Sequence, residues 1–129
     1  MFLPICCVLL LGNTSFKNTN HNWSDWKTST CYQGIDFRVS REDHNEEKNL
    51  WLWEYEFRNR YNENVTFEAS IKPSYDLDCH TNLLIQIDAN GLEGNMADWL
   101  AESNHVNICV NQLKVNGEGN FVPCGTKVS

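Results

Sequence analysis

The side chains best suited to binding a metal ion or moving a proton are four histidines, and their spacing supports neither role. They lie in polar segments with no second histidine two or four positions away: His21, His44, His80 and His105. A metal site needs several ligands that converge on one point, so this pattern predicts no metal site and no cofactor. The stretch DANGLEG (88–94) lacks the third oxygen ligand and the glycine of a calcium loop, and Asp76 and Asp78 lie in a similar polar stretch. Both segments are interpreted as turns.

Nucleophilic catalysis has equally little support in the sequence. No serine lies in a GxSxG motif, and acidic residues in an acidic chain indicate an acid–base pair only when geometry brings them together. We therefore predict no catalytic residues and expect a protein that is not an enzyme.

Cysteine chemistry points instead to covalent stabilisation. Four of the six cysteines lie beyond residue 30, and this even number in a short exported chain predicts two disulfides. We favour Cys31–Cys124 and Cys79–Cys109, because the first would join the ends of the domain and contribute about 4–5 kcal/mol of stability. The alternative is four reduced thiols in a cytosolic protein. No CxxC motif is present to indicate a redox site or a zinc ribbon.

The first thirty residues divide into a leader and a tether. Residues 1–12 are interpreted as an atypical or truncated signal segment, because the apolar run is too short to span a bilayer and no basic residue precedes it. The alternative is a first core strand. Residues 13–30 read as a polar tether in which Trp23 or Trp26, or both, pack back onto the domain. These features predict a secreted, extracellular or periplasmic protein, with surface anchoring left open.

The strongest periodicity in the chain lies in residues 50–59, LWLWEYEFRN. Aromatic rings occupy one face of this predicted strand and charges follow on the other: Trp51, Trp53, Tyr55 and Phe57. We expect the rings to form core, because exposing the whole row would create a large apolar patch. The alternative is a platform on which sugars stack. Leu50 and Leu52 lie on the opposite face, so we expect either the 96–100 segment or the tether tryptophans to cover them, with a partner protein as the alternative.

Further alternating runs predict an all-β fold. They lie at 35–39, 65–71, 83–87 and 106–115, and the 50–61 and 65–73 runs, joined by an Asn-rich loop, predict a hairpin. A change of parity predicts a β-bulge near Asn111 and Gln112. Residues 95–100 have helical spacing and predict one or two helical turns, or an ordered loop.

Strands with one apolar face each must stack to close a core. We therefore expect residues 31–129 to form a single, small antiparallel β-sandwich with at most one short helix. A small barrel is the alternative. The immunoglobulin-like architecture is an analogy only, because the Cys–Trp–Cys spacing of antibody domains is not evident.

Charge narrows the classes of partner. The formal net charge is −7 and no basic run occurs, which argues against binding to nucleic acid or to an anionic membrane surface. No apolar segment is long enough for a transmembrane helix. We expect a non-catalytic binding or accessory domain with a protein or glycan partner; the partner and the oligomeric state stay open. The alternatives are a carbohydrate-binding module, a small secreted inhibitor or effector that pairs an edge strand with its target, and a stabilising domain without a ligand.

Candidate binding residues come from the tether and from the loops at 41–49, 74–81 and 90–104. They are exposed aromatic side chains and one histidine: Trp23, Trp26, His44, Tyr75 and Trp99. Three Asn-x-Ser/Thr motifs mark glycosylation sites that apply only if the source is eukaryotic: Asn13, Asn22 and Asn64.

Overall fold

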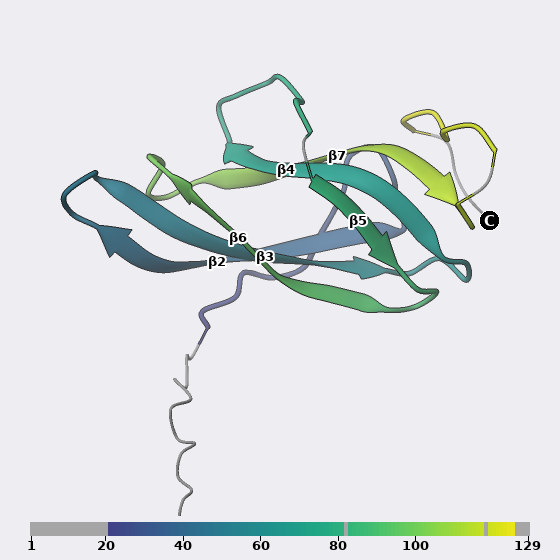
Figure 1. Ribbon diagram of the computed structural model, residues 1–129, viewed down its shortest axis with the longest axis horizontal. Helices are drawn as coiled ribbons and strands as arrows, with labels where there is room; N and C mark the ends of the chain where they lie inside the picture. The colour runs from purple at the N-terminus through teal and green to yellow at the C-terminus, as the bar shows by residue number, and fades with distance from the viewer. Residues whose placement is uncertain (1–20, 82, 118, 126–129) are drawn as a thin grey trace, which may run out of the picture.

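The protein is a two-layer antiparallel β-sandwich (Figure 1). The computed structural model describes residues 21–81, 83–117 and 119–125, so the predictions for residues 1–12 and for Asn13 fall outside the described residues. One sheet has the order β1-β2-β3-β6 and the other the order β5-β4-β7. The strands are β1 (Lys27–Thr28), β2 (Ile35–Asn45), β3 (Leu50–Asn59), β4 (Val65–Pro73), β5 (Leu83–Ile87), β6 (Leu92–Leu100) and β7 (Val106–Val115). The predicted all-β sandwich is confirmed, and the described residues form no helix.

The aromatic run of β3 forms the centre of the core, as its alternation predicts. Trp53, Tyr55 and Phe57 are buried, whereas Trp51 is half-buried near the end of the strand. The Phe57 ring meets the Phe67 ring of the opposite sheet edge-on, with 5.1 Å between centroids. The two inner faces therefore interdigitate through aromatic contacts, which contribute beyond the apolar area they bury.

The predicted hairpin between 50–61 and 65–73 is wrong, although both strands exist. β3 and β4 lie in different sheets, and the chain crosses between layers after Asn59. The buried Asn59 amide holds this corner: it donates to the carbonyls of Glu63 (2.9 Å) and Asp88 (3.1 Å), and its oxygen accepts the Tyr61 N–H (2.9 Å). Two apolar inner faces are better buried against one another than side by side, and periodicity alone does not distinguish these arrangements.

The hairpin that does form joins β2 to β3 through residues 46–49. The loop predicted at 41–49 is therefore shorter than expected, because residues 41–45 pair with β3 as the end of β2. Asn49 there takes a left-handed conformation, with a φ of 52°, which asparagine tolerates better than most residues.

The helical turns expected at residues 95–100 are also wrong, because this segment is the C-terminal half of β6. It pairs with β3 in antiparallel register, placing Met96 opposite Tyr55 and Trp99 opposite Leu52. Pairing gives hydrogen-bond partners to backbone N–H and C=O groups of β3 that would otherwise lie unpaired at the edge of the sheet. This gain outweighs the helical spacing of the side chains in residues 95–100. Trp99 and Leu52 consequently share the outer face, so the 96–100 segment covers Leu52, but as a strand.

The predicted β-bulge in β7 is confirmed. The register with β4 shifts between Thr66 and Glu68, and Gln112 adopts a φ of 56°. The extra residue lets Val110 and Leu113 both face the core.

Two disulfides occur within the described residues, in the favoured pairing. Cys31–Cys124 joins the start of the domain to its C-terminal segment, with 4.4 Å between the Cα atoms. Cys79–Cys109 fastens the β4–β5 loop onto β7, with 5.7 Å between the Cα atoms.

Residues 21–28 lie along β2 as an added, mostly irregular edge of the first sheet. Ser24 N–H donates to the Val39 carbonyl at 2.8 Å, and Val39 N–H donates to Ser24 Oγ at 3.0 Å. Trp23 and Trp26 both pack on the Arg38 guanidinium. The guanidinium carbon lies 4.8 Å from the centre of the Trp23 ring and 4.6 Å from the centre of the Trp26 ring. The tether tryptophans thus pack onto the domain, where they cover a charged part of the sheet rather than the two leucines.

Candidate ligand-binding pocket

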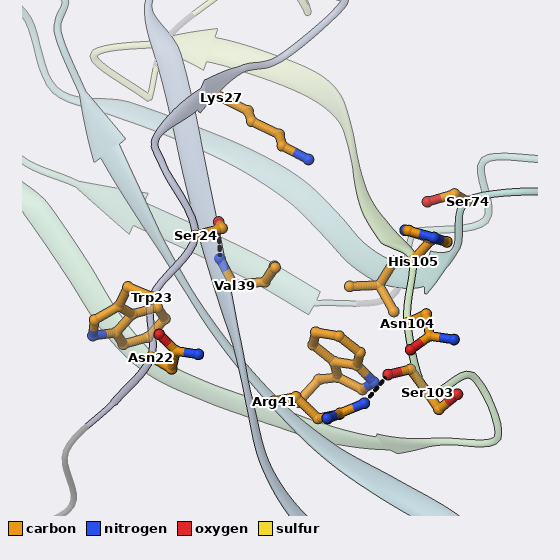
Figure 2. A pocket seen from close by; sticks show the side chains of 12 residues that line it. Asn22, Trp23, Ser24, Lys27, Val39, Arg41, Ser74, Ser103, Asn104 and His105 are labelled. Atoms are coloured by element: carbon orange, nitrogen blue, oxygen red, sulfur yellow. Dashed lines mark hydrogen bonds between the residues drawn. The ribbon is translucent and has the colours of Figure 1, made fainter.

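A pocket of about 490 Å³ opens at one end of the sandwich, where the β4–β5 and β6–β7 loops approach β2 (Figure 2). The antiparallel order brings the β2–β3 turn to this same end (Figure 1). Twelve residues line the pocket: Asn22, Trp23, Ser24, Lys27, Val39, Arg41, Trp53, Ser74, Ser103, Asn104, His105 and Val106.

Hydrogen bonds fix the β6–β7 loop that forms one wall of the pocket. The Glu102 carboxylate accepts the N–H groups of Asn104 (2.8 Å) and His105 (3.2 Å), and these backbone bonds hold the pKa of Glu102 below its usual value. The Glu102 carbonyl accepts the Trp53 indole N–H at 2.9 Å. Ser74 N–H donates to the His105 carbonyl at 2.8 Å and so joins the two loops. The wall is therefore preformed, as ligand pockets usually are.

The permanently charged side chains of the pocket are both positive. Arg41 donates to the Ser103 carbonyl, and its guanidinium lies 4.3 Å from the centre of the Trp51 ring. Lys27 extends into the pocket, and among the described residues its ammonium has neither a hydrogen bond nor an ion pair (Figure 2). None of the twelve lining residues is acidic. A positive pocket on a chain of net charge −7 favours an anionic group over a neutral one.

The remaining lining groups combine hydrogen-bonding side chains with an apolar floor. The floor consists of Val39, Trp53 and Val106, which are largely buried. Hydroxyl and amide groups surround it, from Asn22, Ser24, Ser74, Ser103 and Asn104. Such groups can donate to or accept from ligand hydroxyls, and a lysine or arginine cation can bind a carboxylate. The volume suits a small ligand or one or two sugar units.

The structure does not gather the predicted binding residues into one site. Trp23 alone lines the pocket, and Trp26 packs on Arg38 and Arg58 outside it. His44 stacks on the Trp51 ring with centroids 3.9 Å apart. The two most exposed candidates lie elsewhere, on the β4–β5 loop and on the outer face of β6: Tyr75 and Trp99.

Sequence reasoning missed the residues that carry the pocket's charge. One usable signal exists, because alternation from Ile35 places Arg41 at a core position of β2, where an unpaired charge is unexpected. Lys27 and His105 have no comparable signal, since β1 is two residues long and the β6–β7 loop is placed by tertiary contacts.

Two of the predicted glycosylation sites lie within the described residues and are exposed. Asn22 borders the pocket, and its backbone N–H donates to Ser40 Oγ at 3.1 Å. The Asn64 side-chain oxygen accepts the Ala89 N–H at 3.0 Å. Glycosylation at either site stays a prediction.

Of the two segments compared with a calcium loop, residues 76–78 and 88–91 form turns, whereas residues 92–94 begin β6. Asp76 Oδ1 accepts the Asp78 N–H at 3.0 Å, and Gly91 N–H donates to the Asp88 carbonyl at 3.0 Å. Among the described residues, one group of side chains brings three metal-ligating atoms together, and it lies outside the pocket on the outer face of the first sheet: His21, Glu42 and Glu54.

A scan against models of protein families, a search of curated proteins and a search of solved structures each found no match. No helix in the described part of the chain is long and apolar enough to cross a membrane.

Proposed function

We propose that this chain is an exported, non-catalytic binding domain whose pocket holds an acidic sugar unit of a glycan. The observation that carries the proposal is that the pocket holds two cationic side chains, Lys27 and Arg41, and no acidic one. A carboxylate beside either cation would form charge-assisted hydrogen bonds, which are roughly twice as strong as neutral ones.

An acidic sugar matches the rest of the lining as well as its charge. Its ring hydroxyls would meet the hydroxyl and amide side chains, and the apolar face of its ring would lie against the floor formed by Val39 and Val106.

Export is supported by the two disulfides, since disulfides form and persist mainly in oxidising compartments. Binding rather than hydrolysis is supported by the arrangement of the hydroxyl groups. In the described structure, neither Ser74 nor Ser103 forms a hydrogen bond with the His105 ring, as a nucleophile and its base would.

The test is a calorimetric titration of the whole chain with a short oligogalacturonate and, separately, with a neutral galactose oligomer of equal length. We expect the acidic oligomer to bind at least about tenfold more tightly, since one hydrogen bond to a charged group contributes about 1.5–3 kcal/mol. Raising the salt concentration should weaken this binding.

Lys27→Gln should weaken binding of the acidic oligomer about five- to tenfold without affecting folding, because the Lys27 ammonium has no described partner to lose. The matched control is Lys48→Gln in the exposed β2–β3 turn, which should bind like the natural chain. Equal affinities for the acidic and neutral oligomers, or equal losses in the two variants, would contradict the proposal.

A further inference from the structure

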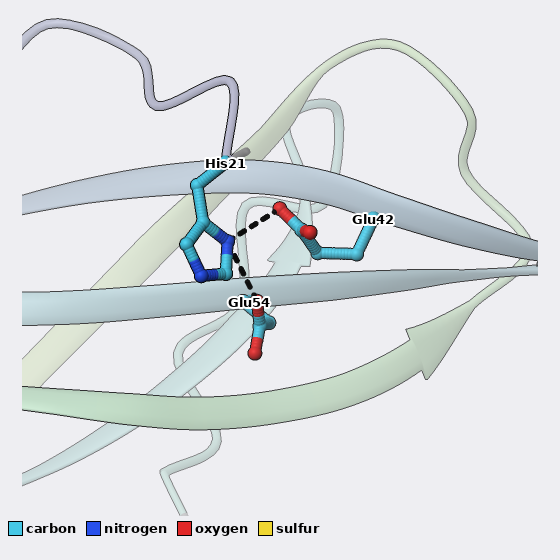
Figure 3. A group of neighbouring side chains, drawn as sticks. All are labelled: His21, Glu42 and Glu54. Carbon is cyan, nitrogen blue, oxygen red and sulfur yellow. Dashed lines mark hydrogen bonds and ion pairs between the residues drawn. The ribbon is translucent and has the colours of Figure 1, made fainter. Parts of the chain in front are cut away.

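Three potential metal ligands meet on the outer face of the first sheet, away from the pocket (Figure 3). His21 Nδ1 lies 2.9 Å from Glu42 Oε2 and 3.0 Å from Glu54 Oε2. One ligand atom from each side chain lies within 4.8 Å of the others. An ion about 2.0–2.2 Å from each atom requires ligand atoms no more than about 4.4 Å apart, and both contacts of His21 Nδ1 meet this limit.

The fold builds this convergence from three separate segments. Glu54 lies opposite Ser40 in the β2–β3 ladder. A register shift between Arg41 and Asp43 leaves Glu42 as an extra residue in β2. Bulges of this kind re-aim a side chain, and here the bulge turns Glu42 toward Glu54 across the same face.

The third ligand comes from the N-terminal segment. Asn22 N–H donates to Ser40 Oγ at 3.1 Å, which places the preceding residue, His21, over the two carboxylates. The Ser40 hydroxyl also contacts the Glu42 carboxylate directly. Such an outer contact orients a ligating carboxylate in metal sites.

Electrostatics make the cluster attractive to a cation. Two like charges on one face of neighbouring strands repel each other, so their juxtaposition is costly without a compensating positive charge. His21 Nδ1 lies within hydrogen-bonding distance of both carboxylates, so a positive charge at this point interacts favourably with them.

The cluster is accessible as well as organised. The side chains are 26% exposed for His21, 13% for Glu42 and 23% for Glu54, so a hydrated ion can reach them and keep water ligands. One imidazole nitrogen with two carboxylate oxygens suits a divalent transition-metal ion, whereas Ca²⁺ and Mg²⁺ prefer sites made of oxygen alone.

We propose that His21, Glu42 and Glu54 bind one divalent transition-metal ion, of the class of Zn²⁺, with water completing its coordination. The ion would take the place of the proton shared by the imidazole and the carboxylates, and would fasten the N-terminal segment to β2 and β3. Because Asn22 follows His21 and lines the pocket, metal binding would also fix one wall of the pocket.

The test is a titration of the whole chain with Zn²⁺ alone, followed by calorimetry. Free thiols are first blocked by alkylation, so that sulfur ligands do not contribute. We expect one ion per chain, and a tenfold or larger loss of affinity in both His21→Ala and Glu54→Gln. The matched control is His80→Ala, which removes an exposed imidazole whose nearest carboxylate oxygen, on Asp78, is 3.9 Å away. It should bind Zn²⁺ like the natural chain.

Several results would overturn the proposal. They are the absence of a one-site isotherm, equal losses in the His80→Ala control, or Ca²⁺ binding as tightly as Zn²⁺. Circular dichroism of each variant checks that it is folded, and Glu54→Gln keeps the size of the side chain if His21→Ala loosens the N-terminal segment. Neither variant removes Lys27 or Arg41, so the result does not depend on the sugar-binding proposal.

Discussion

Replacing Asp36 with asparagine should be among the most destabilising single changes on the outer face of the first sheet. The Asp36 carboxylate, in β2, is 3% exposed and accepts five hydrogen bonds. One comes from Thr28 Oγ1 at 3.0 Å, and two each come from the guanidinium groups of Arg58 and Arg60, at 2.7–3.1 Å. The carboxylate thereby joins β1, β2 and β3 and the start of the crossing between the sheets.

The size of the effect follows from the burial of the partners. Removing one partner of a fully buried ion pair costs about 3–5 kcal/mol, because a charge is left without compensation. Arg58 and Arg60 are 36% and 49% exposed, so both can turn partly toward water. We therefore expect Asp36→Asn to lower the free energy of unfolding by about 2–3 kcal/mol, below the fully buried limit.

Urea denaturation followed by tryptophan fluorescence measures this change at constant ionic strength. The control is Glu46→Gln in the exposed β2–β3 turn, which should shift the free energy of unfolding by less than about 0.5 kcal/mol. A decrease of less than about 1 kcal/mol in the free energy of unfolding of Asp36→Asn would refute the reasoning. It would mean that the five hydrogen bonds stabilise the carboxylate no more than hydrogen bonds to water do.

Three further changes probe other parts of the fold. Burial raises the pKa of Asp36, but hydrogen bonds from Arg60, Arg58 and Thr28 outweigh it, so the folded pKa is below the unfolded value. Its contribution should be fully present above about pH 4 and be lost as the pH falls through the folded pKa; urea titrations from pH 7 to pH 3 should show a shallower acid loss in Asp36→Asn. Phe57→Ala should cost about 3–5 kcal/mol in urea denaturation, because the ring is fully buried; a cost near 1 kcal/mol would contradict its central place in the core. Replacing the Cys31–Cys124 pair with serines opens a link across 93 positions and should cost about 4–5 kcal/mol in thermal unfolding, whereas an unchanged midpoint would contradict a stabilising role.

The individual strands were predictable because burial on one face leaves a two-residue period in the sequence. Trp53, Tyr55 and Phe57 show this clearly, and the change of parity before Leu113 even located a bulge. Which strands pair is a different matter. The 50–59 and 65–73 runs could bury their apolar faces either as neighbouring strands of one sheet or as strands of two sheets that pack face to face. Only the packing of the whole chain selects the second arrangement.

Local spacing misled where tertiary pairing decided the structure. Met96, Trp99 and Leu100 fit a helical face, but β3 offers them an open edge, and pairing with it produces β6. The pocket shows the same limit. Lys27, Arg41 and His105 line one pocket because β1 pairs along β2 and the β6–β7 loop returns to the same end of the sandwich.

The most direct test of ligand binding in the pocket follows the indole resonance of Trp53 by ¹H–¹⁵N NMR. This N–H donates to the Glu102 carbonyl at 2.9 Å, and the ring forms part of the pocket floor, so it reports on occupancy without any change to the chain. We expect galacturonate to shift the Trp53 resonance to saturation and neutral galactose to leave it nearly unchanged. No change in the chemical shift of this resonance on adding galacturonate, or equal changes with both sugars, would contradict an anion-binding pocket.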